Sequence, residues 1–216
     1  MKIAMINGSP KLGQSNSGAA IKMFEPFLDD RHEVIHYNLS KQALSARQYE
    51  ELCGMDALIL AFPLYIDAVP SHLFRMMVEL ETYLQQRPRT DLYVYAIINN
   101  GFYEGRQNHV AAKIIKNWCA RAGLSFGMAI GQGAGEMLGY MEKVPVGHGP
   151  VKNIGKAMEQ LAQSIANREQ DEKQGEVLLF NPNYPRFAWE MAANYGFWHP
   201  QARKNGLKRR DLLKRP

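Results

Sequence analysis

Short apolar runs and amphipathic segments alternate along most of the chain. Two of the runs, residues 56–62 and 92–98, are apolar almost throughout. Such continuous apolar runs are typical of parallel strands that are covered on both faces. The alternation predicts strands at residues 2–7, 32–38, 56–62, 91–99 and 125–131, and helices at residues 16–28, 45–53, 71–86, 107–122 and 151–167.

This order of elements predicts an α/β protein with a parallel sheet wrapped by helices. Five strands and five helices in alternation match the flavodoxin-like three-layer αβα sandwich, a five-stranded parallel sheet of order 2-1-3-4-5. Ligands of such sheets bind beyond the carboxyl ends of the strands. We therefore expect the loops after the first, third and fourth strands to converge on one site.

The last part of the chain departs from this alternation. Residues 168–177 are polar and predict a solvated helix end or a linker. Residues 180–198 then carry seven aromatic side chains with prolines nearby, which suggests a packed extension. We predict one domain at residues 1–170 and an aromatic-rich C-terminal extension with a basic tail at residues 171–216.

The composition allows one full core, because 46% of the 216 residues are hydrophobic. The net charge of +5 is concentrated at the end of the chain, where residues 203–216 hold seven basic side chains against Asp211 alone. Residues 1–202 therefore sum to about −1. The tail has no interleaved aromatic residues, so a solvated or subunit-contacting arm is favoured over a nucleic-acid-binding segment.

Other features narrow the class of protein. The longest apolar run, residues 57–66, is interrupted by Pro63 and is too short for a membrane span, and residues 3–6 are too short for a signal peptide. Cys53 and Cys119 are too few for a disulfide framework, and Cys119 is expected to be buried on a helix face. No pair of histidines has the spacing of a zinc site. We expect a cytoplasmic protein without a metal or membrane partner.

The loop after the first strand carries the clearest chemical signal. Three residues that favour helix N-caps, Ser15, Asn16 and Ser17, stand where the first helix should begin. The unsatisfied N–H groups of a helix N-terminus bind anions. The loop lacks the Lys-Ser/Thr ending of a P-loop and the Gly-x-Gly-x-x-Gly of a dinucleotide fold. An ordinary serine-capped turn is the alternative interpretation.

The segments Gly8-Ser9-Pro10-Lys11 and Ser15-Asn16-Ser17 resemble the phosphate loop of flavodoxin-fold FMN oxidoreductases, which reads Gly-Ser-Pro-Arg and then Ser-Asn-Thr. The resemblance implies an FMN phosphate bound by Ser9, Ser15, Asn16 and Ser17. It places Lys11 as a cation near the phosphate, although a mobile surface lysine is an equal alternative.

The loop after the third strand contains a Pro-x-Tyr segment, which contacts the flavin ring in the resembled family. The resemblance gives this role to Pro63, Leu64, Tyr65 and Ile66. An aromatic side chain in a stiff, proline-bounded loop suits a flat ring. A βα loop with a surface tyrosine is the alternative.

The loop after the fourth strand supplies a third set of candidates. Gly101 would let the backbone approach the flavin ring closely. Asn99, Asn100 and Glu104 are candidates for hydrogen bonds to the ring or the ribityl chain. The family often has a glycine–aromatic stretch here, so Phe102 is expected to cover the ring edge.

Two later segments, residues 149–157 and 202–208, resemble the NAD(P)H-dependent branch of these proteins. The resemblance thus spans nearly the whole chain and points to NADPH-dependent FMN reductases and quinone reductases, which are related to iron–sulfur flavoproteins. The chain lacks the cysteines of an iron–sulfur cluster. It also lacks the Thr-Gly-Asn-Thr type of loop and the strongly acidic surface of electron-carrier flavodoxins.

The resemblance implies an enzyme that transfers hydride from NAD(P)H through FMN to a quinone, an azo or nitro compound, free flavin or an iron complex. No catalytic side chain is expected, because the flavin N5 carries the chemistry. A flavodoxin-like one-electron carrier between protein partners is the alternative. The aromatic extension suggests a homodimer or a higher homo-oligomer.

Overall fold

The structure is a computed structural model that describes residues 1–40, 42–89, 91–168, 170 and 172–214. The chain divides into two compact units, Met1–Pro182 and Asn183–Pro216. The predicted boundary between residues 170 and 171 falls earlier than this division, and residue 171 lies outside the described residues.

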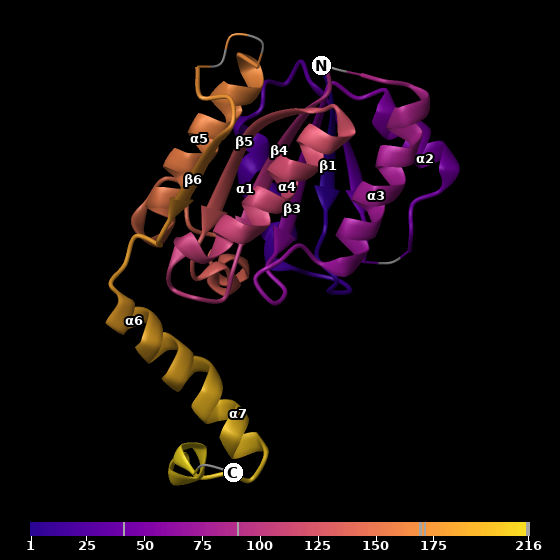
Figure 1. Ribbon diagram of the computed structural model, residues 1–216. Coiled ribbons are helices and arrows are strands. Elements are labelled where there is room, and N and C mark those ends of the chain that lie inside the picture. Colours follow the sequence, from indigo (N-terminus) through magenta and orange to yellow (C-terminus); the bar gives the residue numbers. More distant parts are fainter. Residues whose placement is uncertain (41, 90, 169, 171, 215–216) are drawn as a thin grey trace. The chain divides into compact units, whose positions relative to one another are not determined.

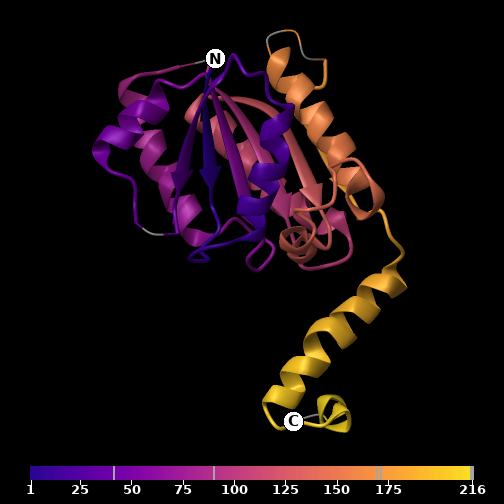
Figure 2. The ribbon, with the colours of Figure 1, turned by 180° about the vertical axis from the view of Figure 1, so that it is seen from behind.

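The first unit is a parallel sheet of six strands in the order β2-β1-β3-β4-β5-β6. Helices cover both of its faces: Figure 1 is seen from the side of α3 and α4, and Figure 2 from the side of α1. The strands are β1 (Lys2–Asn7), β2 (Glu33–Asn38), β3 (Ala57–Pro63), β4 (Tyr93–Asn99), β5 (Ser125–Gln132) and β6 (Glu176–Phe180). The helices of this unit are α1 (Asn16–Phe24), α2 (Ala46–Cys53), α3 (Ser71–Gln86), α4 (His109–Ala122) and α5 (Lys152–Ala166).

The predicted α/β fold class, its five strands and its five helices are confirmed, with small differences at the ends. The helix predicted at residues 16–28 ends as α1 at Phe24 and continues as a 3₁₀ turn, Glu25–Phe27. Pro26 explains the change, because it has no N–H for an α-helical bond. The predicted helix at residues 107–122 begins with a 3₁₀ turn, η2 (Gly105–Asn108), before α4.

The sixth strand corrects the five-stranded prediction. β6 pairs in parallel with β5 from Met128↔Glu176 to Gln132↔Phe180. The polar segment predicted at residues 168–177 therefore ends inside this strand, and residues 169 and 171 lie outside the described residues. β6 is short, and its apolar residues 177–180 do not alternate with polar ones. The sequence therefore does not distinguish this strand from the start of an extension.

Two hydrophobic cores lie on opposite faces of the sheet, one beneath α2, α3 and α4 and the other beneath α1 and α5. Buried polar groups of the aromatic side chains find partners: the Trp118 indole donates to the Met77 carbonyl (3.1 Å) and the Tyr95 hydroxyl to the Ser164 carbonyl (3.3 Å). Cys119 is buried on α4, as predicted, and burial raises the pKa of its thiol to about 12.

The second unit is a helix followed by a basic segment. The helix runs through α6 (Arg186–Met191), a π-helical stretch η5 (Ala192–Trp198) and α7 (His199–Lys204), and a 3₁₀ turn, η6 (Arg209–Leu213), follows. Phe187, Tyr195, Phe197 and Trp198 of this unit are exposed and Tyr184 and Trp189 are half-buried, in contrast to the packed extension that the sequence suggests. Residues 215 and 216 of the predicted tail lie outside the described residues. Among the described helices, none combines the length and apolar character needed to cross a bilayer.

The sheet predicts how two truncations should differ. A chain that ends at Pro182 keeps all six strands and should unfold cooperatively. A chain that ends at Gly175 also loses β6, whose Leu178 and Phe180 pack against the α1–α5 core. Burial of two such side chains contributes ~2–4 kcal/mol, so the shorter chain should melt roughly 5–15 °C lower. Equal melting temperatures by circular dichroism would show that β6 adds nothing to the fold.

Candidate functional site

The strand ends meet at one edge of the sheet. The parallel register sets Asn7 of β1 beside Ala61 of β3, and Pro63 of β3 beside Asn99 of β4. Asn99 in turn is paired with Gln132 of β5. The loops after β1, β3 and β4 therefore lie together at the carboxyl edge, as the predicted topology requires.

Asn7, the last residue of β1, holds the first loop closed. Its Oδ1 accepts a hydrogen bond from the Ser9 N–H (3.1 Å), and its Nδ2 donates to Ser15 Oγ (3.4 Å). The same Ser15 oxygen caps α1 by accepting from the Gly18 N–H (3.1 Å). Sequence reasoning missed Asn7, although a polar residue at the end of an otherwise apolar strand was the available signal.

The three predicted serines of this loop all accept hydrogen bonds. Ser9 Oγ accepts from the Lys11 N–H (3.3 Å), Ser15 Oγ accepts as described above, and Ser17 Oγ accepts from Asn99 Nδ2 (3.0 Å). None of the three hydroxyls donates to another described residue, so their own hydrogens remain available. The backbone N–H groups of Asn16 and Ser17, in the first turn of α1, also lack an acceptor among the described residues. The first turn of α1 is thus surrounded by donors, and the side chain of Lys11 is exposed beside it.

Asn99 connects three of the loops from a buried position, with 3% of its surface exposed. One amide hydrogen goes to Ser17 Oγ at the start of α1, and the other goes to the Phe62 carbonyl of β3 (3.2 Å). Its own carbonyl accepts from the Leu64 N–H (2.9 Å). Both donors of this predicted flavin-binding side chain are therefore used within the protein.

The loop after β3 forms a tight hairpin. Tyr65 and Ala68 exchange two backbone hydrogen bonds of 3.1 Å across Ile66 and Asp67. Both turn residues have positive φ, 50° and 58°, a conformation that is rare for a β-branched residue such as Ile66. The hairpin exposes Tyr65 and Ile66, and in the described structure the N–H groups of Ile66 and Asp67 have no acceptor. Pro63 and Leu64, which the sequence also assigns to the site, support this hairpin from β3.

The loop after β4 is shaped by Asn100. Its Oδ1 accepts from the Phe102 N–H (2.8 Å), and its Nδ2 donates to the Glu104 carbonyl (3.2 Å). This turn leaves the Phe102 ring about half exposed, and the Gly101 N–H has no acceptor among the residues described. The side chain of Asn100 thus holds the loop, while backbone and ring groups face outward.

The loop after β5 belongs to the same edge, although nothing in the sequence singled it out. The Gly135 N–H donates to the Asn100 carbonyl (2.6 Å), which fixes this loop against the one after β4. Its 3₁₀ helix η3 (Gly135–Tyr140) reaches α1, where the Gly139 N–H donates to Asn16 Oδ1 (3.2 Å). Since these contacts use backbone N–H groups, they require no characteristic side chain.

A cavity of about 580 Å³ lies beside the hairpin of the β3 loop. Its lining is mostly apolar and includes Tyr65, Ile66 and Phe74, with Ser71 and His72 as polar members. His72 is hydrogen-bonded to the Gly8 backbone, and burial lowers the pKa of its ring below the ordinary value. Burial thus favours the neutral form of the His72 ring.

Chemically, this edge can bind an anion at α1 and can offer backbone donors and aromatic rings to a flat ligand. In the described residues no group of three or more histidine, cysteine or acidic side chains could hold a metal ion.

No protein-family model matches the sequence, and no curated protein matches it significantly. Solved structures do resemble it. An NADPH-quinone reductase from P. pentosaceus has a TM-score of 0.55 and 16% identity, over 75% of this chain and 98% of that chain. The Trp repressor binding protein from Bacillus subtilis has a TM-score of 0.53 and 18% identity, over 74% of this chain and 96% of that chain.

A flavodoxin from Streptococcus pneumonia TIGR4 has a TM-score of 0.51 and 12% identity, over 77% of this chain and 99% of that chain. Each of these proteins is thus matched over nearly its whole length by about three quarters of this chain. At such identities the likeness shows the fold. The chain has the flavodoxin-like fold, and its sheet carries a sixth strand.

Proposed function

We propose that the protein is an FMN-dependent oxidoreductase that takes hydride from NAD(P)H and passes the electrons to a small-molecule acceptor. The observation that carries this proposal is the set of unused donors at the start of α1. Ser9, Ser15 and Ser17 accept hydrogen bonds from the protein and keep their hydroxyl hydrogens for a ligand. A phosphate group presents only acceptors at this position, so the donor set fits the phosphate of FMN.

The neighbouring loops fit the rest of the cofactor. The N–H groups of Ile66, Asp67 and Gly101 are free to donate to the carbonyl oxygens and ring nitrogens of a flavin. The exposed rings of Tyr65 and Phe102 provide flat surfaces for it. A bound flavin supplies hydride acceptance at N5, a reaction that side chains do not perform. The role of the protein is then to bind and orient the flavin and to exclude water from it.

The cavity beside Tyr65 favours an enzyme over a one-electron carrier. Its volume of about 580 Å³ and its apolar lining suit a ring-sized molecule. Neutral His72 and Ser71 can hydrogen-bond an uncharged acceptor without imposing a charge on it. The carrier remains the second candidate, because flavodoxins share the fold.

The remaining assignments are part of the same proposal. We propose that the protein acts in the cytoplasm as a homodimer or higher homo-oligomer, without a nucleic-acid or membrane partner. Residues 1–202 have almost no net charge, so this part of the chain has no overall electrostatic attraction for a polyanion.

The phosphate assignment predicts a difference between two ligands. Replacing Ser15 and Ser17 together by alanine removes donors to the phosphate, each worth ~1.5–3 kcal/mol. The two losses sum to ~3–6 kcal/mol, so FMN should bind at least roughly 100-fold more weakly, whereas riboflavin, which lacks the phosphate, should be little affected. Fluorescence titration measures both affinities.

Ser45→Ala is the matched control for the lost helix cap. Ser45 caps α2 by accepting from the Gln48 N–H (3.3 Å) and lies outside the site loops. This variant should lose cap stability but keep its affinity for FMN. Equal losses of FMN and riboflavin in the double variant would place the phosphate elsewhere.

The position of Asn99 predicts that Asn99→Asp loosens the whole site. An aspartate leaves the Phe62 carbonyl without a donor, and it takes up the Ser17 hydroxyl hydrogen that would otherwise serve a ligand. Each unsatisfied buried group costs ~1–3 kcal/mol, so urea unfolding should show a clear loss of stability, and both FMN and riboflavin should bind more weakly. At Asn38, which ends β2, the same change keeps an oxygen for the Ser40 N–H and should be nearly neutral. A fully stable Asn99→Asp variant would contradict the connecting role.

The reaction proposed here predicts ping-pong kinetics. If one flavin serves the nicotinamide and the acceptor in turn, double-reciprocal plots at several fixed quinone concentrations should be parallel. Stopped-flow spectra should also show flavin reduction by NADH or NADPH in the absence of the acceptor. Intersecting lines would indicate a ternary complex, and no turnover with either nucleotide would favour the electron carrier.

A further inference from the structure

The second unit, Asn183–Pro216, has almost no core of its own. Of its described apolar residues, Ala202 alone is buried. Its exposed apolar side chains are large and between 41% and 64% accessible: Phe187, Met191, Tyr195, Phe197, Trp198, Leu207 and Leu212. A unit of this size with so much exposed apolar surface is expected to be covered by another surface.

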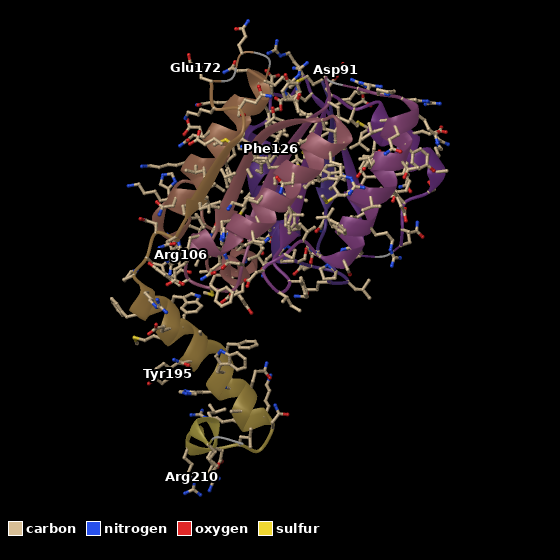
Figure 3. All side chains as sticks on the ribbon, in the orientation of Figure 1. Asp91, Arg106, Phe126, Glu172, Tyr195 and Arg210 are labelled. Atoms are coloured by element: carbon tan, nitrogen blue, oxygen red, sulfur yellow. The ribbon has the colours of Figure 1, made fainter. Side chains whose placement is uncertain are left out.

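One face of the helix combines bulky side chains with a hollow. Phe187, Met191, Tyr195 and His199 recur every four residues. The Tyr195 and His199 rings meet edge-on with centroids 5.0 Å apart, so this face continues through the π-helical stretch. Figure 3 labels Tyr195 on this helix. Phe187 and Met191, at the start of the face, are 64% and 56% exposed.

The hollow lies at the other end of the same face. It has a volume of about 320 Å³ and is lined by residues of this unit alone, among them Tyr195, His199, Ala202, Leu207 and Leu212. The helix thus offers two protruding apolar side chains at its start and, near its end, a hollow whose lining combines leucines with Arg203. A surface of this kind is complementary to itself when two copies run in opposite directions.

We infer that the second unit is a self-association surface on which two copies of the chain pair through antiparallel helices about a twofold axis near Tyr195. In this arrangement Met191 faces His199 of the partner subunit, and Phe187 enters the partner's hollow. The contact is isologous, so both copies make it at once and no surface is left to extend the assembly. This inference concerns assembly and does not depend on the proposed flavin chemistry.

The exposed area is sufficient for such a pair. Phe197 lies two residues after Tyr195 and points to the opposite side of the helix, so six large apolar side chains, each about half exposed, present on the order of 600 Å² per copy. Specific, stable protein interfaces begin at about 600 Å² on each partner. A second copy brings a matching surface at the same concentration as the first.

The charges favour the antiparallel direction. Between residues 187 and 202 the one charged side chain besides His199 is Glu190, which pairs with Arg186 (Nε–Oε1, 3.0 Å). The basic residues begin at Arg203, which lines the hollow at the end of the face, and continue from there toward the C-terminus. Parallel pairing would bring two basic segments together, whereas antiparallel pairing separates them.

The first test is the mass of the full chain in solution. Light scattering at micromolar concentration should give twice the 24.5 kDa of one chain. Phe187→Lys places a second positive charge beside Arg203 of the partner subunit in the hollow and should weaken the dimer at least about 30-fold, as for an interface hot spot. Phe74→Lys is the matched control, because Phe74 is a comparably exposed phenylalanine on α3 and should leave the dimer intact.

Three outcomes overturn the inference: a monomeric wild-type chain, a Phe187→Lys variant that stays dimeric, or a Phe74→Lys variant that dissociates. The last result would place the interface on the first unit. A monomeric chain that nevertheless binds a different protein would assign the apolar face to that partner.

The second test fixes the direction of the helices. A cysteine in place of Tyr195 lies at the proposed axis and should form a disulfide with its copy under mild oxidation by diamide. A cysteine in place of Phe187 lies roughly 24 Å from its copy and should not, since a disulfide needs Cα atoms within about 7 Å. Cys53 and Cys119 are buried and should not interfere. Equal cross-linking at both positions would indicate parallel helices, and no cross-link at Tyr195→Cys would reject the axis. Flavin content measured on the same samples keeps this result separate from the proposed function.

Discussion

The carboxyl edge of the sheet is held together by the side-chain amide of Asn99. A buried amide must satisfy both of its hydrogens, and the acceptors here are Ser17 Oγ at the start of α1 and the Phe62 carbonyl of β3. The Asn99 amide thus supplies the Phe62 carbonyl with a side-chain donor at the end of the β3–β4 ladder. Asn99 thereby fixes the first turn of α1 relative to the hairpin that follows β3.

The same constraint explains where the unused donors are. Once Asn7 and Asn99 have supplied hydrogens to Ser15 and Ser17, the oxygens of these serines are satisfied. Their hydroxyl hydrogens can then turn only toward a ligand or solvent. A site built this way selects an acceptor-rich group without a permanently charged side chain in contact with it. A cofactor that performs the reaction itself would need no more from the protein than such positioning.

The sequence was sufficient to predict most of the fold, because the strands of a doubly covered parallel sheet are apolar throughout and the helices are amphipathic. It did not predict β6, since Glu176–Phe180 is short and joins directly to an aromatic segment. A polar residue at a strand end can either bind a ligand or hold neighbouring loops together, and the sequence does not distinguish these two roles. Asn99 and Asn100 were expected to hydrogen-bond a flavin, which stays a prediction, and in the structure their amides connect neighbouring loops. That distinction depends on which loops the tertiary fold brings within reach, and a single sequence does not contain those distances.

The loop after β5 shows a further limit of the same kind. Gly135 and Gly139 act through backbone N–H groups, which every residue but proline possesses. Gly135 is still restricted by its surroundings, because a Cβ there would lie 2.5 Å from Cβ of Asn99. Glycine is thus required at position 135, because any larger residue would collide with Asn99, which connects the other loops. A glycine-rich segment after a buried strand is therefore informative once the neighbouring strand ends are known, and the same packing argument extends the site from three loops to four.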